Sequence, residues 1–449
     1  MSKSLHFVPI LTAGRDYVGN TWKLPGSPIE LKDRLEANFE TAKIAEEGKL
    51  DAILYADIVF GTNGEFWKHL PPGDFEALTL LTAIAERTNQ LGVIPSLSTT
   101  YDIPFQVARR VLSLDHISDG RAGWNVVATF SEQLARAVAG DSLPKHLARY
   151  QRADEFTSIV TSLWDGFEED STVADASTGI FTDPEKVHTT EFHGEHFNVS
   201  GLLGQTRSTQ GRPVLFQAGS SEHGVEFAAK HAEVVFTSQK TLESSLEFTN
   251  TLRDKAFALG RETAPLTLPG LTFVLGSTEE EANRIEREYL DAVIPEVWLG
   301  SHYATTFFAP EHSATLLDDL DAPLPPFLDS VEGYQTAFNI AKQQASEKNF
   351  TVRDFLHLTL RGDQFAYWVG TPEKIAAEIE RWFTAGAADG FIFVLFHNVN
   401  AELKKFTDHV VPILQRKGIF REDYEGDTLR SHLGLEIPAN SFTASRVGV

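Results

Sequence analysis

Short apolar runs recur along the chain and alternate with amphipathic stretches. Eight runs have the length and composition of buried strands, and they cover 5–11, 51–57, 91–99, 122–129, 213–219, 232–238, 266–276 and 390–396. Between them, apolar residues recur at helical spacing, as in 31–49, 75–88, 105–118, 150–164, 241–260 and 372–387. Because eight strands that alternate with helices are typical of a closed barrel rather than an open sheet, we predict an α/β fold, a (β/α)8 TIM barrel.

Two intervals between the predicted strands are too long for simple loops. Residues 165–212 are rich in Asp, Thr, Gly and His, and residues 291–369 include the proline-rich segment LDAPLPPFLDS. Structureless loops of this length are uncommon in a compact domain, and long insertions are usually lids or oligomer contacts. We therefore predict one domain over residues 1–449 with these two insertions, and assembly into a homo-oligomer.

Composition excludes several classes of function. The 449 residues include 63 acidic and 39 basic side chains and no cysteine, for a net charge of −24. Such acidity opposes binding to nucleic acid or an anionic membrane, and the lack of cysteine excludes disulfides and thiolate metal sites. The start, MSKSLHFVPI, lacks the pattern of a secretory signal, and no apolar run is long enough for a membrane helix. We expect a cytoplasmic protein.

Small polar residues follow the predicted strand at 213–219. Gly219, Ser220 and Ser221 come directly before the helical segment VEFAAKHA, so a helix should begin near Ser221. The first turn of a helix has unpaired N–H groups, and a glycine lets a ligand such as a phosphate approach the backbone. The alternative is that one of the serines only caps the helix.

Other polar and aromatic residues stand at predicted strand ends. Asn125 lies within the strand at 122–129, and its amide needs a partner, either a ligand or a neighbouring backbone group, because an unpaired buried amide costs about 1–3 kcal/mol. Asp57 ends the second strand, where it could face the barrel mouth or cap a helix. Tyr17 and Trp22, in the loop after the first strand, are candidate pocket walls or simple loop anchors.

Familiar motifs of other enzyme classes are missing from the sequence. His188, His193 and His196 have a spacing found among metal ligands, but their segment is typical of a surface hairpin, so we predict no metal site. No strand is followed by G-x-G-x-x-G, and neither G-x-x-x-x-G-K-[ST] nor G-x-S-x-G occurs. The sequence therefore does not support a Rossmann nucleotide site, a P-loop or a serine hydrolase.

Several ordered blocks carry a family resemblance from residue 5 to about 434. They include LDHISDGRAGWNVVAT, QGRPVLFQAGSSEHGVEFAAKHAEVVF, RYQRADEFTSIVTSLWDGF and YWVGTPEKIAAEIERWFTAGAADGFIF. With these blocks the chain resembles the flavin-dependent monooxygenases of the bacterial luciferase superfamily. It is most similar to the branch that contains nitrilotriacetate, dibenzothiophene sulphone and long-chain alkane monooxygenases, and riboflavin lyases.

This resemblance implies an FMN site at the carboxyl-end mouth of the barrel. The phosphate would lie on the QAGSS segment beside the tyrosine of RYQRA, and the fourth strand would flank the flavin ring. The residues that match the family's cofactor-binding positions are Phe7, Asp57, Asn125, Val127, Thr129, Tyr150, Gly219, Ser220 and Ser221. No catalytic side chain is identified, because in such enzymes the flavin carries the difficult chemistry.

The resemblance also implies an activity. It indicates a two-component monooxygenase that takes reduced FMN from a separate NAD(P)H-dependent flavin reductase and uses O₂ to oxygenate or cleave a small organic substrate. Among possible substrates, an aromatic or heterocyclic compound is favoured, and a second flavin is one member of this class. The loop AGRDYVGNTWKLP lacks the histidines usual in the family at this place, which leaves the substrate open. An F420-dependent dehydrogenase of the same superfamily and a non-catalytic flavin-binding protein are the alternatives.

Overall fold

The computed structural model describes residues 4–11, 21–23, 27–57, 75–129, 132–299, 303–331, 335–361, 365–395 and 398–443. Parallel strands form a nearly closed barrel, and the predicted α/β TIM barrel is confirmed. Their order is β1 (His6–Pro9), β13 (Gly390–Phe393), β11 (Leu266–Leu275), β10 (Val234–Thr237), β9 (Val214–Ala218), β4 (Gly123–Val127), β3 (Gly92–Ser98) and β2 (Ala52–Tyr55). Next to β1, the Leu11 N–H donates to the Leu54 carbonyl oxygen at 2.9 Å, which brings β1 and β2 together.

One further strand was not predicted. β12 (Ala366–Gly370) pairs in parallel with the second half of β11, whereas β10 pairs with the first half. β11 can serve both neighbours because it is ten residues long. The sequence places β12 at the end of the second insertion, and its short run AYWVG lies between the turn residues of RGD and GTP, a strand signal that our prediction missed.

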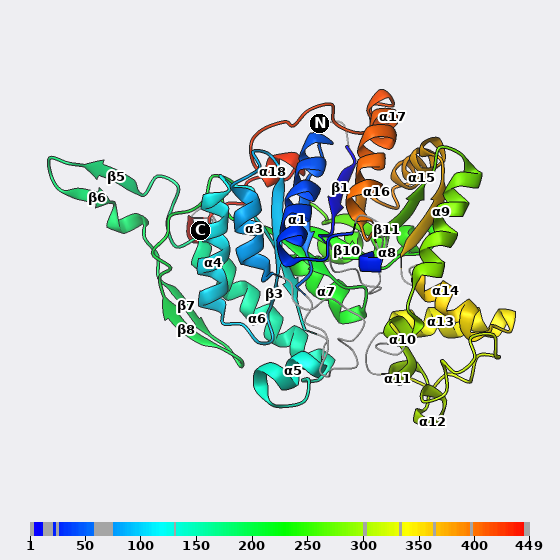
Figure 1. Cartoon of the computed structure of the whole chain (residues 1–449). Helices are drawn as coiled ribbons and strands as arrows, with labels where there is room; N and C mark the ends of the chain where they lie inside the picture. Colours follow the sequence, from blue (N-terminus) through cyan, green and yellow to red (C-terminus); the bar gives the residue numbers. More distant parts are fainter. Residues whose placement is uncertain are drawn as a thin grey trace.

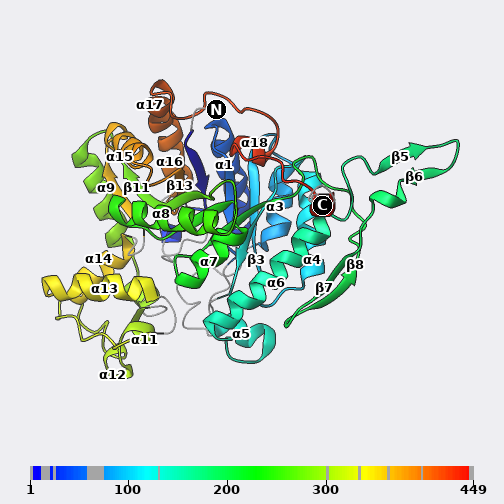
Figure 2. The same cartoon turned by 180° about the vertical axis from the view of Figure 1, so that it is seen from behind.

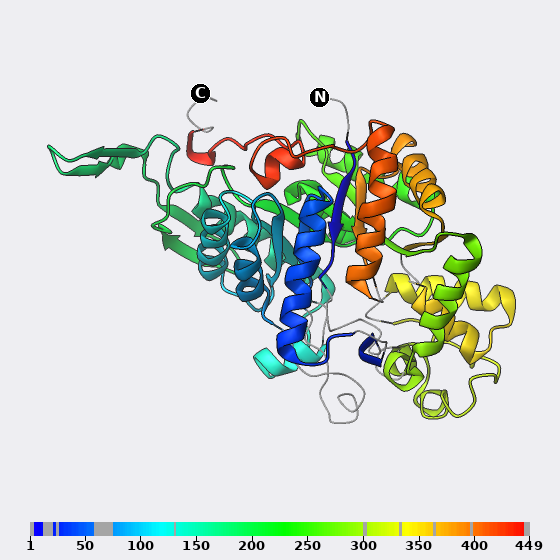
Figure 3. The same ribbon diagram turned by 45° about the horizontal axis from the view of Figure 1, so that its top comes forward.

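Helices surround the barrel, as Figures 1 and 3 show. The longest predicted helices are all present, with ends within a few residues of the expected ones. No helix of the described residues is long and apolar enough to cross a membrane. The helices and turns of the barrel layer are η1 (Thr21–Lys23), α1 (Leu31–Glu47), α3 (Ala77–Ala85), α4 (Pro104–Ile117), α5 (Glu132–Ala139), α6 (His146–Trp164), α7 (Glu222–His231), α8 (Leu242–Ala258), α9 (Glu279–Ala292), α15 (Pro372–Thr384), α16 (Val399–Lys405), η4 (Phe406–Val410), α17 (Val411–Arg416) and α18 (Leu429–His432).

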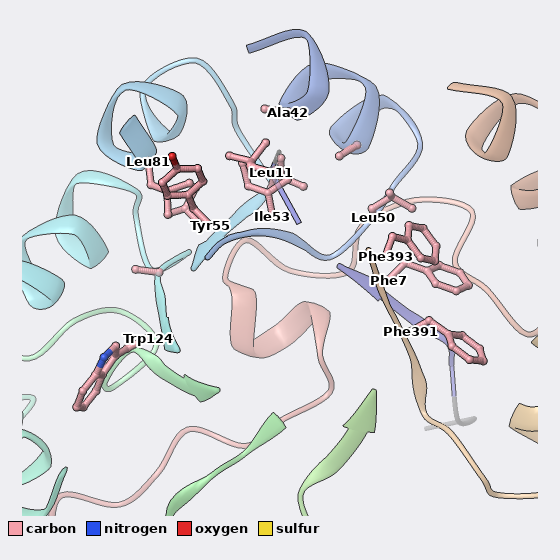
Figure 4. Packing of buried hydrophobic residues seen from close by; sticks show 14 of the residues in the cluster. Phe7, Leu11, Ala42, Leu50, Ile53, Tyr55, Leu81, Trp124, Phe391 and Phe393 are labelled. Carbon is pink, nitrogen blue, oxygen red and sulfur yellow. The ribbon is translucent and has the colours of Figure 1, made fainter. Parts of the chain in front are cut away.

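The two faces of the strands bury different clusters. Since successive side chains of a strand point to opposite faces, alternate residues face the helices or the barrel interior. Residues on the helix side, among them Phe7, Ile53 and Trp124, belong to one large cluster with the helices (Figure 4). Residues on the interior side, such as Leu54 and Phe216, belong to a second cluster. A side chain can therefore be assigned to the interior by its position in the alternation.

The two predicted insertions have different architectures. Residues 165–212 form two antiparallel hairpins, β5 (Thr172–Asp175) with β6 (Ile180–Thr182) and β7 (Thr190–His193) with β8 (Asn198–Gly201), joined by η2 (Pro184–Lys186). The β5–β6 hairpin stands away from the barrel (Figures 1 and 2), and the surface hairpin predicted around His193 is confirmed. The second insertion contains α10 (Pro295–Trp298), α11 (Ala304–Phe307), α12 (Pro310–Ser313), α13 (Gln335–Lys348) and α14 (Val352–Leu360). Its aromatic core, which includes Phe307 and Phe355, joins the interior cluster of the barrel.

Candidate active site

A layer of polar side chains occupies the interior face of β3 and β4 toward their carboxyl ends. Asn125 is 4% exposed, and its Nδ2 donates to Ser96 Oγ at 2.8 Å. Two residues further along, the hydroxyls of Thr129 and Ser98 are 2.7 Å apart. Asn125 Oδ1, by contrast, has no donor among the described residues. An unpaired buried carbonyl oxygen costs about 1–3 kcal/mol, so this atom is able to accept a hydrogen bond from a ligand.

A buried arginine lies at the end of the same strand. Arg149, from α6, donates from Nη1 to the carbonyl oxygen of Thr129 and is 7% exposed. Its Nε has no acceptor among the described residues, and burial lowers the pKa of the guanidinium. Between Asn125 and Thr129, the half-buried Val127 keeps its backbone fixed by accepting the Thr99 N–H at 2.9 Å. Sequence reasoning missed Arg149, although it directly precedes Tyr150.

The second group of predicted residues lies where β9 passes into α7. Ser221 is the N-cap of α7, and its Oγ accepts the Gly224 N–H at 3.2 Å, so the predicted helix start is confirmed. Ser220 Oγ accepts the Ser238 N–H at 3.0 Å, which fixes this turn to the end of β10. Both serines therefore have the capping or bracing role that was the simpler alternative. The Gly219 N–H donates to the Phe236 carbonyl oxygen at 3.3 Å, whereas the first N–H groups of a helix have no partner within the helix.

Gly219 occupies a crowded position beneath Tyr150. A Cβ on Gly219 would lie 2.5 Å from Gln217 Nε2 and 3.2 Å from the Tyr150 hydroxyl. The same hydroxyl lies 3.1 Å from the position of a Cβ on Gly224, so it stands over the first turn of α7. Burial raises the pKa of Tyr150, which keeps its hydroxyl protonated as a donor. Gln217 is 2% exposed, and its Oε1 has no donor among the described residues.

Two histidines that the sequence did not single out complete this group. His146 Nε2 lies 3.4 Å from Ser221 Oγ, and the ring centroid of His146 is 5.5 Å from that of His223. The Tyr150 ring lies 5.0 Å from His146 and 6.4 Å from His223. These residues come from α6 and from the first turn of α7, which are distant in sequence. They lie together only because the fold packs the starts of these two helices against each other.

The remaining predicted residues are not brought to these two groups. Asp57 Oδ2 accepts the N–H of Ala77, the first residue of α3, at 3.2 Å, although the N-cap of that helix is Glu76, and a cofactor role for Asp57 stays a prediction. Phe7 is fully buried on the helix side of β1, with its ring centroid 5.3 Å from Phe393 and 5.3 Å from Phe406. We therefore leave Phe7 out of the site proposed below.

Of the two residues predicted as pocket walls in the N-terminal loop, the structure describes only one. Trp22 lies in η1 and is 38% exposed. The neighbouring Lys23 Nζ donates to the Ala292 carbonyl oxygen at 3.2 Å, which ties this turn to the end of α9. Tyr17 lies outside the described residues. A pocket role for Trp22 and Tyr17 stays a prediction.

An aromatic pair lies at the ends of β10 and β11. The rings of Phe236 and Phe365 are stacked, with centroids 5.5 Å apart and planes at 21°. Phe236 is on the interior face of β10, and both rings are only partly buried against the interior cluster. A Cβ on Gly270 would lie 2.3 Å from the Phe365 ring, so this glycine is what lets the ring lie over β11. The pair offers a flat apolar surface within the same barrel.

Comparison with known proteins agrees with this geometry. The model of the luciferase-like monooxygenases matches residues 7–389. The N-acetyl-S-(2-succino)cysteine monooxygenase of Bacillus subtilis (strain 168) is 38% identical over 435 residues, which are 96% of this chain and 97% of that protein. The nitrilotriacetate monooxygenase component A of Aminobacter aminovorans is 36% identical over 94% of both chains.

A solved structure supports the same assignment. The crystal structure of a riboflavin lyase, with modified FMN and its substrate riboflavin, superposes with a TM-score of 0.80 at 31% identity and covers 97% of both chains. The nitrilotriacetate and riboflavin lyase relatives are two of those that the sequence blocks resemble. The chain therefore belongs to the luciferase-like monooxygenase family, and the enzyme class predicted from its sequence, a flavin-dependent monooxygenase, is confirmed.

Proposed function

We propose that the chain is the oxygenating component of a two-component system, which takes reduced FMN from a separate NAD(P)H-dependent flavin reductase and uses O₂ as co-substrate. The observation that carries the proposal is the pairing of two features at one barrel mouth. One is the start of α7, with Gly219 beneath the Tyr150 hydroxyl. The other is the buried oxygen of Asn125, which has no donor among the described residues.

The first feature fits a phosphate. The N–H groups at the start of α7 and the positive end of its dipole favour an anion, and the missing Cβ of Gly219 leaves room for close approach. The protonated hydroxyl of Tyr150 is a further donor over the same turn. In this proposal Ser220 and Ser221 hold the turn rigid through their own hydrogen bonds, and the backbone of the turn binds the phosphate.

The second feature fits the edge of a flavin ring. Reduced FMN supplies the electrons that activate O₂, and the protein supplies position, hydrogen bonds and exclusion of water. Asn125 Oδ1 would accept an N–H from the ring, with Nδ2 held in place by Ser96. Val127 would contact the ring through its side chain, and the hydroxyl pair of Thr129 and Ser98 would keep the neighbouring wall polar.

For the substrate, we propose a small aromatic or heterocyclic molecule, with a second flavin included, that is oxygenated or oxidatively cleaved. The partly buried, stacked rings of Phe236 and Phe365 support a flat substrate, because aromatic rings stack favourably on one another. The likeness to a riboflavin lyase supports the same class. Relatives named for N-acetyl-S-(2-succino)cysteine and nitrilotriacetate make small carboxylated molecules the class to test beside it.

The experiment supplies the purified chain with FMN, NADH and a flavin reductase under ¹⁸O₂ and screens both classes of substrate by mass spectrometry. Product that contains ¹⁸O, formed only with FMN and O₂, is the expected result. Turnover that continues without O₂ and needs F420 would instead indicate a dehydrogenase. Binding of FMN without any turnover over the panel would favour a non-catalytic flavin-binding protein.

A further inference from the structure

We propose that residues 420–434, which include α18, form an acid-sensitive strap across the amino end of the barrel, and that protonation of His432 releases this strap while the barrel stays folded. We call this segment the base strap. It lies at the end of the barrel opposite the candidate active site, and the inference is independent of the proposed function. It gives a role to a buried histidine that takes no part in the proposed chemistry.

The base strap closes the amino end of the barrel. Figures 1 and 2 show α18 close to the N-terminal end of the chain, where β1 begins. Leu429 and Leu433 of α18 are buried, and both belong to the interior cluster of the barrel. A Cβ on Gly92, the first residue of β3, would lie 2.6 Å from Leu429 Cδ1. These leucines therefore cover the interior of the barrel at this end.

The base strap is able to open without unfolding the barrel. Residues 420–434, all of which the structure describes, form one short helix and no strand of the sheet. The chain is attached on both sides of them: the Ile419 carbonyl oxygen accepts the Leu5 N–H at 2.9 Å, and Asn440 Nδ2 donates to the Asp165 carbonyl oxygen at 2.8 Å. Segments of this kind open locally at a lower free energy than the whole domain.

His432 fits its place in the strap only as a neutral ring. It is 5% exposed, and its Nε2 lies 3.1 Å from the Gly426 carbonyl oxygen. Because a carbonyl oxygen only accepts, Nε2 carries the ring proton and Nδ1 carries none. Nδ1 has no hydrogen-bond partner among the described residues. A second proton would therefore create a buried donor without an acceptor, which is costly.

The charges around His432 also oppose a positive ring. Arg421 Nη2 donates to the His432 carbonyl oxygen at 2.7 Å, and Arg421 Nη1 has no acceptor among the described residues. The nearby carboxylate, Asp51, is already paired with Arg421 and accepts from His6 Nδ1 at 2.9 Å. The titratable groups that face His432 are Arg421 and Tyr424 of the strap, Asp51 before β2, Arg121 before β4 and, beyond Asp51, His6 of β1.

The sign of the pH effect follows from these surroundings. Burial lowers the pKa of His432 from 6.5, and Arg421 and Arg121 outweigh the opposing effects of Gly426 and Asp51. In the open strap the ring is in water and its pKa returns to the ordinary value. The open state therefore binds more protons, and the preference for the closed strap, complete above pH 6.5, is lost as the pH falls below it.

A second buried group makes local opening the right quantity to measure. Burial raises the pKa of Asp115 to about 6, so this carboxyl takes up a proton in the folded barrel over the same pH range. Its protonation stabilises the folded barrel as the pH falls, which opposes the effect of His432 on global stability. Exchange of the amides of the strap itself separates the two groups. The N–H of Leu429 donates to the Gly120 carbonyl oxygen, and that of Leu433 to the Leu429 carbonyl oxygen.

The test is hydrogen exchange of the full chain, without ligand, followed by mass spectrometry at about pH 7.5 and about pH 5.5. Protection factors, which are corrected for the intrinsic exchange rate at each pH, are compared for peptides of the strap and of β3 and β4. We expect the strap to lose protection about fivefold or more at the lower pH, as a pKa difference of about one unit gives. The strand peptides should change less than about twofold.

A variant and a matched control isolate the ring. H432Q keeps an Nε2 donor for the Gly426 carbonyl oxygen but does not titrate, so protection of its strap should change less than about twofold between the two pH values. H409Q, on the exposed side of η4, should behave like the parent. Circular dichroism checks that each variant is folded.

A second readout does not depend on H432Q. The chain contains no cysteine, so Leu433→Cys in the buried strap and Ser142→Cys on the surface each give a single thiol. A pyridyl disulfide should label position 433 about fivefold faster, relative to position 142, at the lower pH.

Three results would overturn the inference. They are equal protection of the strap at both pH values, full pH dependence in H432Q, and loss of protection by strap and strands together. None of them involves a flavin, so the proposed function stands or falls separately.

Discussion

The two ends of the barrel each bury an arginine, and the two residues are used in opposite ways. Arg121 lies at the amino end, directly before β4, and is 4% exposed. All five of its N–H donors have acceptors: the carbonyl oxygens of Ser118, Ala85, Thr88 and Leu91 and the hydroxyl of Thr88. This guanidinium has no donor left for a ligand, and its role is to tie the loops beneath the barrel together.

Arg149 lies at the carboxyl end of the same strand and is 7% exposed. It donates to the Thr129 carbonyl oxygen, but its Nε has no acceptor among the described residues. The same contrast separates Asp51 from Asn125. Both oxygens of Asp51 accept hydrogen bonds at the amino end, whereas Asn125 Oδ1 has no donor among the described residues at the mouth. Single buried atoms without a partner also occur at the amino end, such as Arg421 Nη1 and Asp115 Oδ2. What sets the mouth apart is that Asn125 Oδ1 and Arg149 Nε lie there together with the glycine turn before α7.

The largest predicted effect is a loss of folding stability when a buried charge at the amino end of the barrel is removed. Asp51 accepts from His6 at 2.9 Å and from the Phe7 N–H at 2.7 Å, and it is paired with Arg421. Asp51→Asn should lower the free energy of unfolding by about 3–5 kcal/mol, because it leaves a buried guanidinium without its counter-charge. Urea unfolding followed by circular dichroism measures this, and a loss below about 1 kcal/mol would contradict the structural role. FMN affinity of the folded variant should not change.

The next effect is expected at the mouth and concerns binding. Gly219→Ala places a methyl group 3.2 Å from the Tyr150 hydroxyl and displaces the Gln217 amide. We expect the dissociation constant of reduced FMN to rise about thirtyfold, with little loss of stability. The matched control is Gly201→Ala in β8, where a Cβ would have nothing within 4 Å. Equal FMN binding by both variants would rule out a phosphate on this turn.

A smaller effect is expected at Asn125. Asn125→Leu removes an oxygen that has no donor among the described residues and one buried hydrogen bond to Ser96, so the free energy of unfolding should fall by no more than about 1.5 kcal/mol. If the ring of FMN donates to this oxygen, affinity for reduced FMN should fall about tenfold. Anaerobic fluorescence titration measures the affinity. Unchanged affinity together with a large loss of stability would reverse the comparison, since Asn125 would then be structural.

The smallest effect is a change in pH dependence. Burial raises the pKa of Asp51, but Arg421, His6 and hydrogen bonds outweigh it, and the net pKa is lowered from 3.8. A carboxyl with a lowered folded-state pKa contributes stability above its unfolded value, and this contribution is lost as the pH falls through the folded value. The stability gap between the parent chain and Asp51→Asn should therefore narrow below about pH 4. A gap that stays constant down to pH 3 would contradict this linkage.

Much of the fold was predictable because its signals are local. Apolar runs mark the buried strands, and the serine at position 221 marks the start of α7. Asn125 stood out because an amide in an apolar run needs a partner. The side of β1 that Phe7 occupies was not predictable, since the strand HFVP is buried on both faces and its short pattern does not distinguish them.

The rest of the site depends on contacts between distant segments. His146 meets Ser221 across 75 residues, and nothing in either local sequence indicates that α6 and α7 start side by side. The same holds for Phe236 and Phe365, whose stacking depends on Gly270 in a third segment. Asp57 was ambiguous because the same carboxylate suits the barrel mouth and a helix start, and only the fold shows that it accepts the Ala77 N–H of α3.

The most direct test of the account is a crystal structure of the chain with FMN bound. It predicts the phosphate beside Gly219, within hydrogen-bonding distance of backbone N–H groups of Ser220 and the first turn of α7 and of the Tyr150 hydroxyl, with the ring beside Asn125 and a ring N–H donating to its Oδ1. A phosphate bound at another helix, or a ring that leaves Asn125 Oδ1 without a donor, would contradict it.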